Sequence, residues 1–169
     1  QTGEGQTVTI RPIKPEDADL EQEFVQSLSA ETKYFRFMNT IRELSQSQLI
    51  RLTQIDYDRE MAFVAMAQQQ DSSQEKEVGV ARYATNPDGD SCEFAIVVSD
   101  AWQGKGVARR LMGVLIEAAR SSGLKYMNGD FLAENGRMLA FVSSLGFVMS
   151  PHPEDSGLKR GVLVLSQFT

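Results

Sequence analysis

A glycine-rich turn is the segment of this chain whose residue types and spacing point most directly to chemistry. Gly104 and Gly106 flank Lys105, directly after an apolar run and directly before an amphipathic stretch. Glycine lets a backbone approach a ligand closely because it has no Cβ. The free N–H groups in the first turn of a helix, aided by the helix dipole, favour an anion such as a pyrophosphate. The pattern therefore predicts a phosphate-binding turn.

Two common phosphate signatures do not fit this turn. A P-loop requires Gly-x-x-x-x-Gly-Lys-Ser/Thr, and neither glycine is placed to begin one. A dinucleotide fingerprint requires a third glycine three residues after Gly106, where Arg109 stands instead. The pattern that does fit is Gln/Arg-x-x-Gly-x-Gly/Ala, formed here by Gln103, Gly104, Lys105, Gly106, Val107 and Ala108.

A carboxylate on the apolar run before the turn, Glu93, is the candidate general base. Strand alternation places Glu93, Ala95 and Val97 on one face, so the small Ala95 leaves room for an incoming amine. The other face carries Cys92, Phe94, Ile96 and Val98. The alternative role for Glu93 is that of an ordinary solvated carboxylate, as for most strand glutamates.

The register of the preceding hairpin decides what lies opposite Glu93. Arg82 in that place would lower the pKa of Glu93 and weaken it as a base. A shift of one residue would bring Tyr83 there instead, a more permissive neighbour. The sequence leaves both pairings open.

The elements that must position these residues follow from periodicity and turn chemistry. Strands are expected at 7–13, 61–67, 78–84, 92–99, 125–132, 147–149 and 161–167. Helices are expected from residue 15, from residue 45, at 105–122 with Val107, Leu111, Val114 and Ala118 on its buried face, and at 135–145. The polar stretch 68–77 is typical of a mobile hairpin loop. Strands outnumber helices, which predicts a mixed α/β (α+β) domain.

Length and composition narrow the class of protein. The chain has 169 residues, with 17 Lys and Arg against 23 Asp and Glu, a net charge of −6. That length predicts one domain over residues 1–169, with 1–6 disordered, and that charge argues against a nucleic-acid partner. Cys92 is the only cysteine, which excludes an intrachain disulfide and a cysteine-based zinc site. No apolar run is long enough to span a membrane, so we expect a cytoplasmic protein. A first residue other than Met fits a domain excised from a longer chain.

The order of these motifs resembles the GNAT superfamily of N-acyltransferases. In that superfamily the segment matching 103–108 is the acyl-CoA pyrophosphate loop. An Asn matching Asn135 opens a later helix near the cofactor, and Leu-Gly-Phe, here residues 145–147, ends that helix. The resemblance runs from Ile10 to Phe168. Segments 10–17, 34–38 and 56–61 are most similar to bacterial protein-lysine acetyltransferases, which often carry this domain behind an acyl-CoA-synthetase-like region.

The resemblance implies a fold and a set of site residues. The fold is a single domain with a central mixed, mostly antiparallel sheet of six to seven strands, flanked by about four helices. Acetyl-CoA is the implied co-substrate, without a metal; main-chain groups of Ile96 and Val98 hold its pantetheine arm, and residues 103–108 and Asn135 complete its site. Glu93, in the matching Glu-Phe-Ala segment, is the implied catalytic glutamate. Arg109 and Arg110 either meet phosphates or are solvated helix cations.

One position departs from the family pattern. Many GNAT enzymes carry a Tyr four residues before the Gly of Leu-Gly-Phe, as the acid for the departing thiolate, and this chain has Val142 there. Either the thiolate leaves unaided or water supplies the proton. His152, between two prolines, is expected to be a loop residue without the partners of a metal ligand.

These observations predict an acetyl-CoA-dependent N-acetyltransferase that modifies a lysine of a protein by direct transfer, with an acyl-CoA synthetase among the candidate substrates. A small-molecule amine as acceptor is the second hypothesis. The third is a non-catalytic acyl-CoA-binding module that regulates an attached domain, and Val142 is its one direct support.

Overall fold

One seven-stranded sheet organises the described part of the protein. The computed structural model describes residues 8–29, 60–68, 75–99, 102–103, 106–153 and 157–165. The strand order is β1-β2-β3-β4-β5-β7-β6. The strands are β1 Val8–Pro12, β2 Glu60–Gln68, β3 Glu75–Thr85, β4 Ser91–Val98, β5 Tyr126–Leu132, β6 Val148–Pro151 and β7 Leu158–Val164. The mixed α/β sheet is therefore as predicted.

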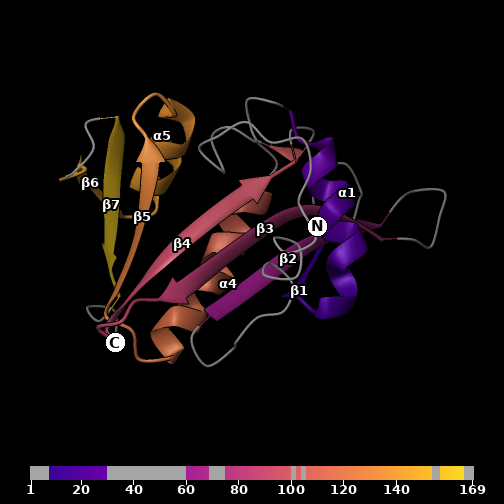
Figure 1. Ribbon diagram of the computed structural model, residues 1–169, viewed down its shortest axis with the longest axis horizontal. Helices are drawn as coiled ribbons and strands as arrows, with labels where there is room; N and C mark the ends of the chain where they lie inside the picture. The colour runs from indigo at the N-terminus through magenta and orange to yellow at the C-terminus, as the bar shows by residue number, and fades with distance from the viewer. Residues whose placement is uncertain are drawn as a thin grey trace.

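Neighbouring strands are antiparallel except at the centre, where β4 and β5 run parallel. The β4–β5 register covers only three pairs, Ser91 with Tyr126, Cys92 with Met127 and Glu93 with Asn128. Beyond these pairs the two strands separate, and Figure 1 shows them diverging toward the top of the view. The sheet thus opens at one end of its centre.

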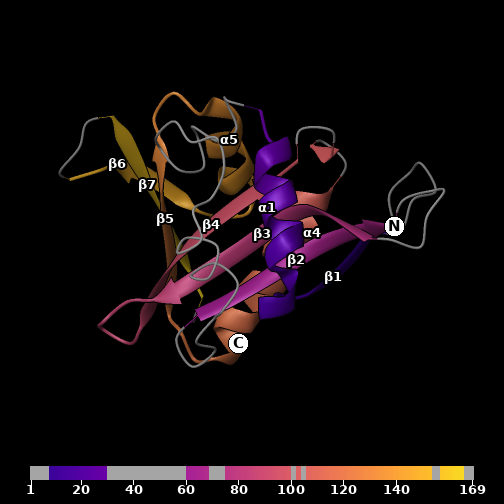
Figure 2. The same ribbon diagram turned by 45° about the vertical axis from the view of Figure 1, so that its right-hand side comes forward.

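Helices cover both faces of the sheet. A 3-10 turn, η1 Pro15–Asp17, leads into α1 Ala18–Ser27 on one face, whereas α4 Val107–Ser121 and α5 Gly136–Ser144 lie on the other (Figures 1 and 2). Two buried clusters reflect this arrangement. The larger one packs α4 against the sheet, and the smaller one packs Phe24 and Val25 of α1 against Val64 and Val97.

A β-bulge in β3 decides which residues lie under α1. Ala65 pairs with Gly79 but Met66 pairs with Glu77, so Val78 is the extra residue. A Cβ on Gly79 would lie 3.0 Å from Leu111 Cδ1, which places Gly79 on the α4 side. Val78 also packs in the α4 cluster, so the bulge turns Glu77 to the α1 face, where it is buried.

Two sequence expectations about element positions are wrong. Residues 75–77 belong to β3 rather than to a hairpin loop, because they continue its pairing with β2. Val114 of α4 is 38% exposed, whereas Leu115 is fully buried, so the buried face of the helix is rotated from the expected one. The helix expected from residue 45, the disorder expected at 1–6, and the motifs at 34–38 and 56–59 fall outside the described residues.

Three α-helices and the η1 turn are seen in the described residues, against about four helices expected. No helix in this part of the chain combines the length and the apolar character needed to cross a membrane.

Candidate active site

The alternation of β4 places its side chains as predicted. Glu93 is exposed, and Ala95 follows it on the same face. Val97 packs in the α1 cluster, whereas Cys92, Phe94, Ile96 and Val98 pack in the α4 cluster. Burial raises the pKa of the Cys92 thiol to about 12. Cys92 is thus a core residue, and Glu93 presents its carboxylate on the α1 side of the sheet.

The hairpin register differs from both predicted pairings of Glu93. Ala84 lies opposite it on β3, and Asn128 lies beside it on β5. The loop fixes this register because the Asn86 N–H donates to the Ser91 carbonyl at 2.8 Å, while Asp88 accepts from the Ser91 N–H at 3.0 Å. No hydrogen bond or ion pair joins Glu93 to another described residue. The small Ala84 and Ala95 leave its carboxylate accessible.

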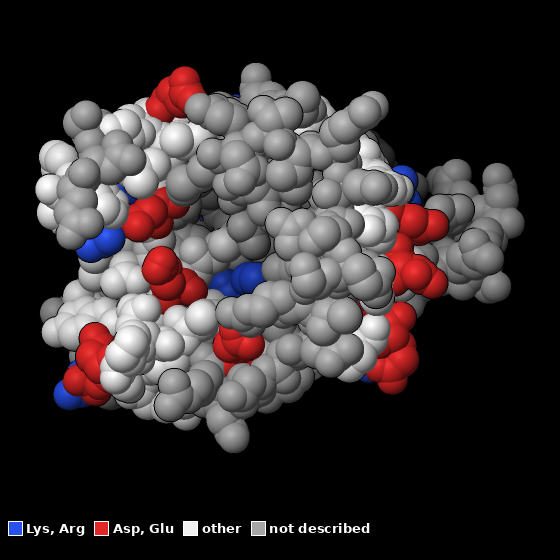
Figure 3. Space-filling view, in the orientation of Figure 1, with Lys and Arg blue, Asp and Glu red and all other residues white. Residues whose placement is uncertain are grey.

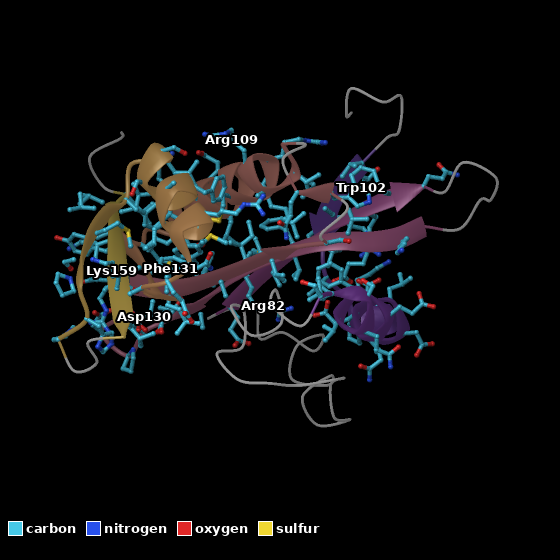
Figure 4. All side chains as sticks on the ribbon, turned by 90° about the horizontal axis from the view of Figure 1, so that it is seen from above. Arg82, Trp102, Arg109, Asp130, Phe131 and Lys159 are labelled. Carbon is cyan, nitrogen blue, oxygen red and sulfur yellow. The ribbon has the colours of Figure 1, made fainter. Side chains whose placement is uncertain are left out.

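Arg82, the cation that could have faced Glu93, is held elsewhere. It lies opposite Ala95 on the same face as Glu93, two pairs further along β3 and β4. Its guanidinium donates to Glu21 Oε2 of α1 at 3.0 Å. Figure 4 shows Arg82 on the α1 side of the sheet and Arg109 on the α4 side.

The last part of β4 has main-chain N–H and C=O groups that face β5 but lie beyond the residues paired with it. The Ser99 N–H donates to Val78 of β3 at 2.8 Å, and the Ser91 carbonyl also faces β3. Because backbone groups alternate along a strand, the N–H and C=O groups of Ile96 and Val98 face the β5 side. The β5 register ends at Glu93, so this part of the edge lies beyond the paired residues.

Gln103, a predicted cofactor residue, contacts this edge. The Trp102 N–H donates to the Ser99 carbonyl at 2.9 Å, and Gln103 follows Trp102 beside the end of β4. Its side-chain Nε2 then donates to the Val98 carbonyl at 3.0 Å. Gln103, the first residue of the predicted phosphate-binding segment, is therefore tied to the end of β4.

The N-terminus of α4 fits an anion. Gly106 is the N-cap of α4, and its φ of 86° lies in the left-handed region. No described residue lies within 4 Å of where a Cβ on Gly106 would be, so the positive φ, rather than crowding by these residues, accounts for the glycine. The N–H groups of Val107 and Ala108 belong to the first turn. Gly104 and Lys105 lie outside the described residues.

The two arginines in the first turn of α4 have protein partners. Arg109 donates to the Ser144 hydroxyl at 2.9 Å, and its guanidinium lies 5.7 Å from the centre of the Phe141 ring. Arg110 donates to the Val8 carbonyl at 3.3 Å. Both guanidinium groups are thus engaged with neighbouring elements of the protein.

The helix α5 supplies a cap and a core residue. The Asn135 side chain accepts from the Met138 N–H at 3.4 Å and so caps the helix. Val142, where many family members have a Tyr, is 0% exposed and packs in the main core. Position 142 therefore offers no proton to a leaving group.

A group of buried charges beneath α1 was not predicted. Glu21 and Glu77 are each 1% exposed, and Asp17 is 3% exposed. Burial and the neighbouring Glu21 raise the pKa of Glu77 well above its usual value, although Arg82 opposes the shift. Burial also disfavours the Asp17 carboxylate, but hydrogen bonds from Arg11 and the Lys14 N–H outweigh it and lower the pKa. A signal was present in β3, whose apolar pattern is interrupted by Glu77 and Arg82.

A second polar cluster lies on the β5–β7 side of the same face. Asp130 accepts from Arg160 Nε at 2.9 Å, and Arg160 also contacts His152 Nε2 at 3.0 Å. His152 thus has ionic neighbours that the sequence did not reveal. Among the described residues, no three His, Cys, Asp or Glu side chains form a group that could hold a metal ion.

Comparison with known proteins decides the family. A family model described as the acetyltransferase (GNAT) domain matches residues 7–148. The chain belongs to the GNAT family of acetyltransferases. This GNAT domain is an N-acetyltransferase that uses acetyl-CoA.

Two curated relatives resemble this GNAT domain along most of its length. Acetyltransferase PA5475 of Pseudomonas aeruginosa is 39% identical over 153 residues, covering 90% of this chain and 81% of that protein. Acetyltransferase Pat of Mycolicibacterium smegmatis is 28% identical over 149 residues, covering 88% of this chain and 43% of Pat. The chain thus spans less than half the length of Pat.

Solved structures share the fold. The GNAT domain of S. lividans PAT superposes with a TM-score of 0.83 at 23% identity, over 98% of this chain and 99% of that one. Spermidine N-acetyltransferase from Vibrio cholerae, solved with CoA and spermine, gives a TM-score of 0.73 at 20% identity, over 94% and 96% of the two chains.

Proposed function

We propose that this GNAT domain acetylates a lysine side chain of a protein, with Glu93 as the general base. The observation that carries the proposal is the position of Glu93. Its exposed carboxylate, without a partner among the described residues, stands at the last pair before β4 and β5 separate. The edge of β4 that continues from there leads to the N-terminus of α4.

The described residues fit acetyl-CoA along this edge. The N–H groups of Val107 and Ala108, after the left-handed Gly106, suit the pyrophosphate. Main-chain groups of Ile96 and Val98 suit the pantetheine arm, much as a bound peptide extends a sheet. The bound co-substrate supplies an acyl group activated as a thioester. Gln103 contributes by fixing the Val98 carbonyl, and Asn135 by capping α5.

The role of Glu93 is to take a proton from the acceptor. A pH of 7 is about 3.4 units below the pKa of a lysine ammonium, so deprotonating that group costs about 4.6 kcal/mol. A carboxylate within hydrogen-bond reach makes the loss of this proton part of the reaction path. A proton donor at position 142 is not required, because thiols ionise with a pKa of about 8.5.

Two lines of support favour a protein lysine as the acceptor. The segments 10–17, 34–38 and 56–61 resemble bacterial protein-lysine acetyltransferases. The likeness to Pat covers 88% of the chain. A small polyamine is the second candidate, and the shared fold with spermidine N-acetyltransferase is the observation that favours it.

Thiol release from acetyl-CoA separates these functions. The purified chain is offered an acyl-CoA synthetase protein, spermidine and free amino acids in turn. We expect release with the protein acceptor, accompanied by acetyl-lysine detected by mass spectrometry. Faster release with spermidine would favour the polyamine. CoA binding without release for any acceptor would favour a regulatory module.

Replacing the proposed base tests the mechanism. We expect Glu93→Gln to keep its affinity for acetyl-CoA and to lose at least about tenfold in kcat, because a general base typically contributes about 100-fold or more. Glu117→Gln, a change at an exposed glutamate of α4, is the control and should retain full turnover. An unchanged kcat for Glu93→Gln between pH 6 and 9 would remove Glu93 from the mechanism.

A further inference from the structure

We propose that Asn128 is a second catalytic residue, whose side-chain amide oxygen accepts a hydrogen bond from the acceptor nitrogen while Glu93 takes a proton from it. The inference rests on the proposed function, and it adds the group that holds the acceptor beside the base. The predicted site residues lie on β4 and around α4 and α5, whereas Asn128 lies on β5.

The strand register places Asn128 directly beside Glu93. One row of paired residues crosses the sheet from β2 to β6 and consists of Glu60, Ala84, Glu93, Asn128, Val162 and Val148. Residues paired in this way point to the same face of the sheet. Met127 and Phe131 of β5 pack in the α4 cluster, so the alternation of β5 turns Asn128 to the α1 side, where Glu93 also lies.

The amide of Asn128 is available to a substrate. Its side chain is half-buried, and no hydrogen bond or ion pair joins it to another described residue. Its neighbour on the side away from Glu93 is Val162 of β7, whose side chain has no polar group. An amide offers an oxygen that accepts and an NH₂ group that donates. Asn128 can therefore bind a polar group that reaches Glu93.

The spacing of the two residues fits an amine nitrogen. Neighbouring strands lie about 4.8 Å apart. A tetrahedral nitrogen that donates two hydrogen bonds of about 2.9 Å holds its two acceptor atoms about 4.7 Å apart. Glu93 and Asn128, side by side at the last pair of β4 and β5, can supply those two acceptors. The carboxylate then removes a proton, whereas the amide, which is not a base at this pH, keeps only its hydrogen bond.

Other charged side chains near this row have partners of their own. Arg82 of β3 donates to Glu21 at 3.0 Å, and Asp130 of β5 accepts from Arg160 at 2.9 Å. Glu60 of β2 also has an interaction. Figure 3 shows acidic groups gathered around a basic group on this face of the molecule, a setting that suits a cationic acceptor.

A neutral amide suits the place beside the base. A cation at position 128 would repel the acceptor ammonium and lower the pKa of Glu93, and a second carboxylate would raise that pKa. Asn128 does neither, because its amide does not titrate. It can therefore hold the acceptor nitrogen without changing the charge next to Glu93.

Asn128→Ala removes the proposed hydrogen bond. We expect kcat/KM for the acceptor to fall about tenfold or more, because hydrogen bonds to charged groups are among the stronger ones. The KM for acetyl-CoA should not change, because the proposed contacts of acetyl-CoA are on β4 and α4. The acceptor is the acyl-CoA synthetase protein, or spermidine if its release of thiol is faster, since both offer an ammonium nitrogen. Should Asn128→Ala not fold, Asn128→Leu keeps the size without the polar atoms, and the same fall is expected.

Asn128→Asp gives a readout that a purely structural role would not move. The variant keeps an oxygen at the same reach but places a second carboxylate beside Glu93, and a like charge raises a carboxylate pKa. The acid limb of the kcat/KM profile should therefore move up by about half a pH unit or more. The NMR titration of the Glu93 carboxyl carbon should show the same shift without an acceptor. Tyr126, Asp130 and His152 titrate in the wild type and the variant alike, so they do not account for a difference between the two.

Gln68 provides the matched controls. It is an exposed amide at the opposite end of β2 from Glu60, the member of the row on that strand. Gln68→Ala should keep the wild-type kcat/KM, and Gln68→Glu should leave the acid limb unmoved, because the added charge is far from Glu93.

The possible failures can be told apart. A wild-type kcat/KM for the acceptor in Asn128→Ala, or an unmoved acid limb in Asn128→Asp, would overturn the inference and leave the proposed function in place. Full turnover in Glu93→Gln would instead refute the proposed base. A wild-type protein that releases no thiol with either acceptor would refute the proposed function, and this inference with it.

Discussion

The buried position of Glu77 makes the contribution of this residue to folding stability depend on pH. It is 1% exposed beneath α1, and burial together with Glu21 raises its pKa. A raised pKa means that the folded protein holds the proton more tightly than the unfolded chain does. The contribution of Glu77 to stability is therefore fully present below the unfolded pKa of about 4.5 and is lost as the pH rises through the higher folded pKa.

Glu77→Gln should remove this decline, because glutamine has the shape of the neutral acid and does not ionise. We expect the variant and the wild type to unfold at similar urea concentrations at pH 5. At pH 8 the variant should be the more stable of the two, because the folded wild type must either keep Glu77 protonated or ionise it in a buried site. Urea unfolding at the two pH values measures the difference. Equal stabilities at pH 8 would contradict the assignment, and Glu23→Gln provides the baseline for an exposed glutamate.

At the scale of helices and strands, the sequence predicts features that depend on neighbouring residues, but not contacts between residues far apart in the chain. The alternation of β4 and the strand–turn–helix around Gly106 depend on neighbours in sequence, and both were predicted. The partner of Arg82, Glu21, is 61 positions away, and only the packing of α1 on β3 brings the two together. The register opposite Glu93 depended on the hydrogen bonds of Asp88 in the loop, which side-chain types alone do not determine.

The start of α4 gives a prediction at this scale. Gly106→Ala forces a side chain into the left-handed region, at a cost of about 1–2 kcal/mol, although no described residue crowds the new Cβ. The backbone that presents the first N–H groups of α4 should shift to relieve that strain. We expect the Kd for CoA, measured by calorimetry, to rise about 5–30-fold, the equivalent of that cost.

A glycine in the same helix provides the control for this prediction. Gly113 is exposed, has no described residue within 4 Å of its Cβ position and lies within α4. Gly113→Ala should leave the Kd for CoA unchanged and stabilise the helix by up to about 1 kcal/mol. Unaltered CoA binding in Gly106→Ala would argue against a pyrophosphate at this helix terminus.

The whole sheet consists of two parts joined by a short central seam. Strands β1 to β4 form one part and β5 to β7 the other, and only three residue pairs connect β4 with β5. Helices α4 and α5 bridge the two parts on one face through the main core. A ligand that adds hydrogen bonds along the free edge of β4 would bind only while this arrangement is intact. Ligand binding should therefore stabilise the molecule as a whole.

The rate at which Cys92 reacts with a thiol reagent measures this stabilisation, because Cys92 lies in the seam between β4 and β5, opposite Met127, and is 0% exposed. Burial raises its pKa to about 12, so a thiol reagent should label it only after the core has opened. When opening is fast and reversible, a ligand at 100 times its Kd lowers the open population about 100-fold, the equivalent of about 2.7 kcal/mol. We expect CoA to slow Cys92 labelling by that factor in the wild type, and by less in Gly106→Ala at the same CoA concentration. An equal labelling rate with and without saturating CoA would show that CoA binding does not require the closed seam. The CoA site would then lie away from β4 and α4.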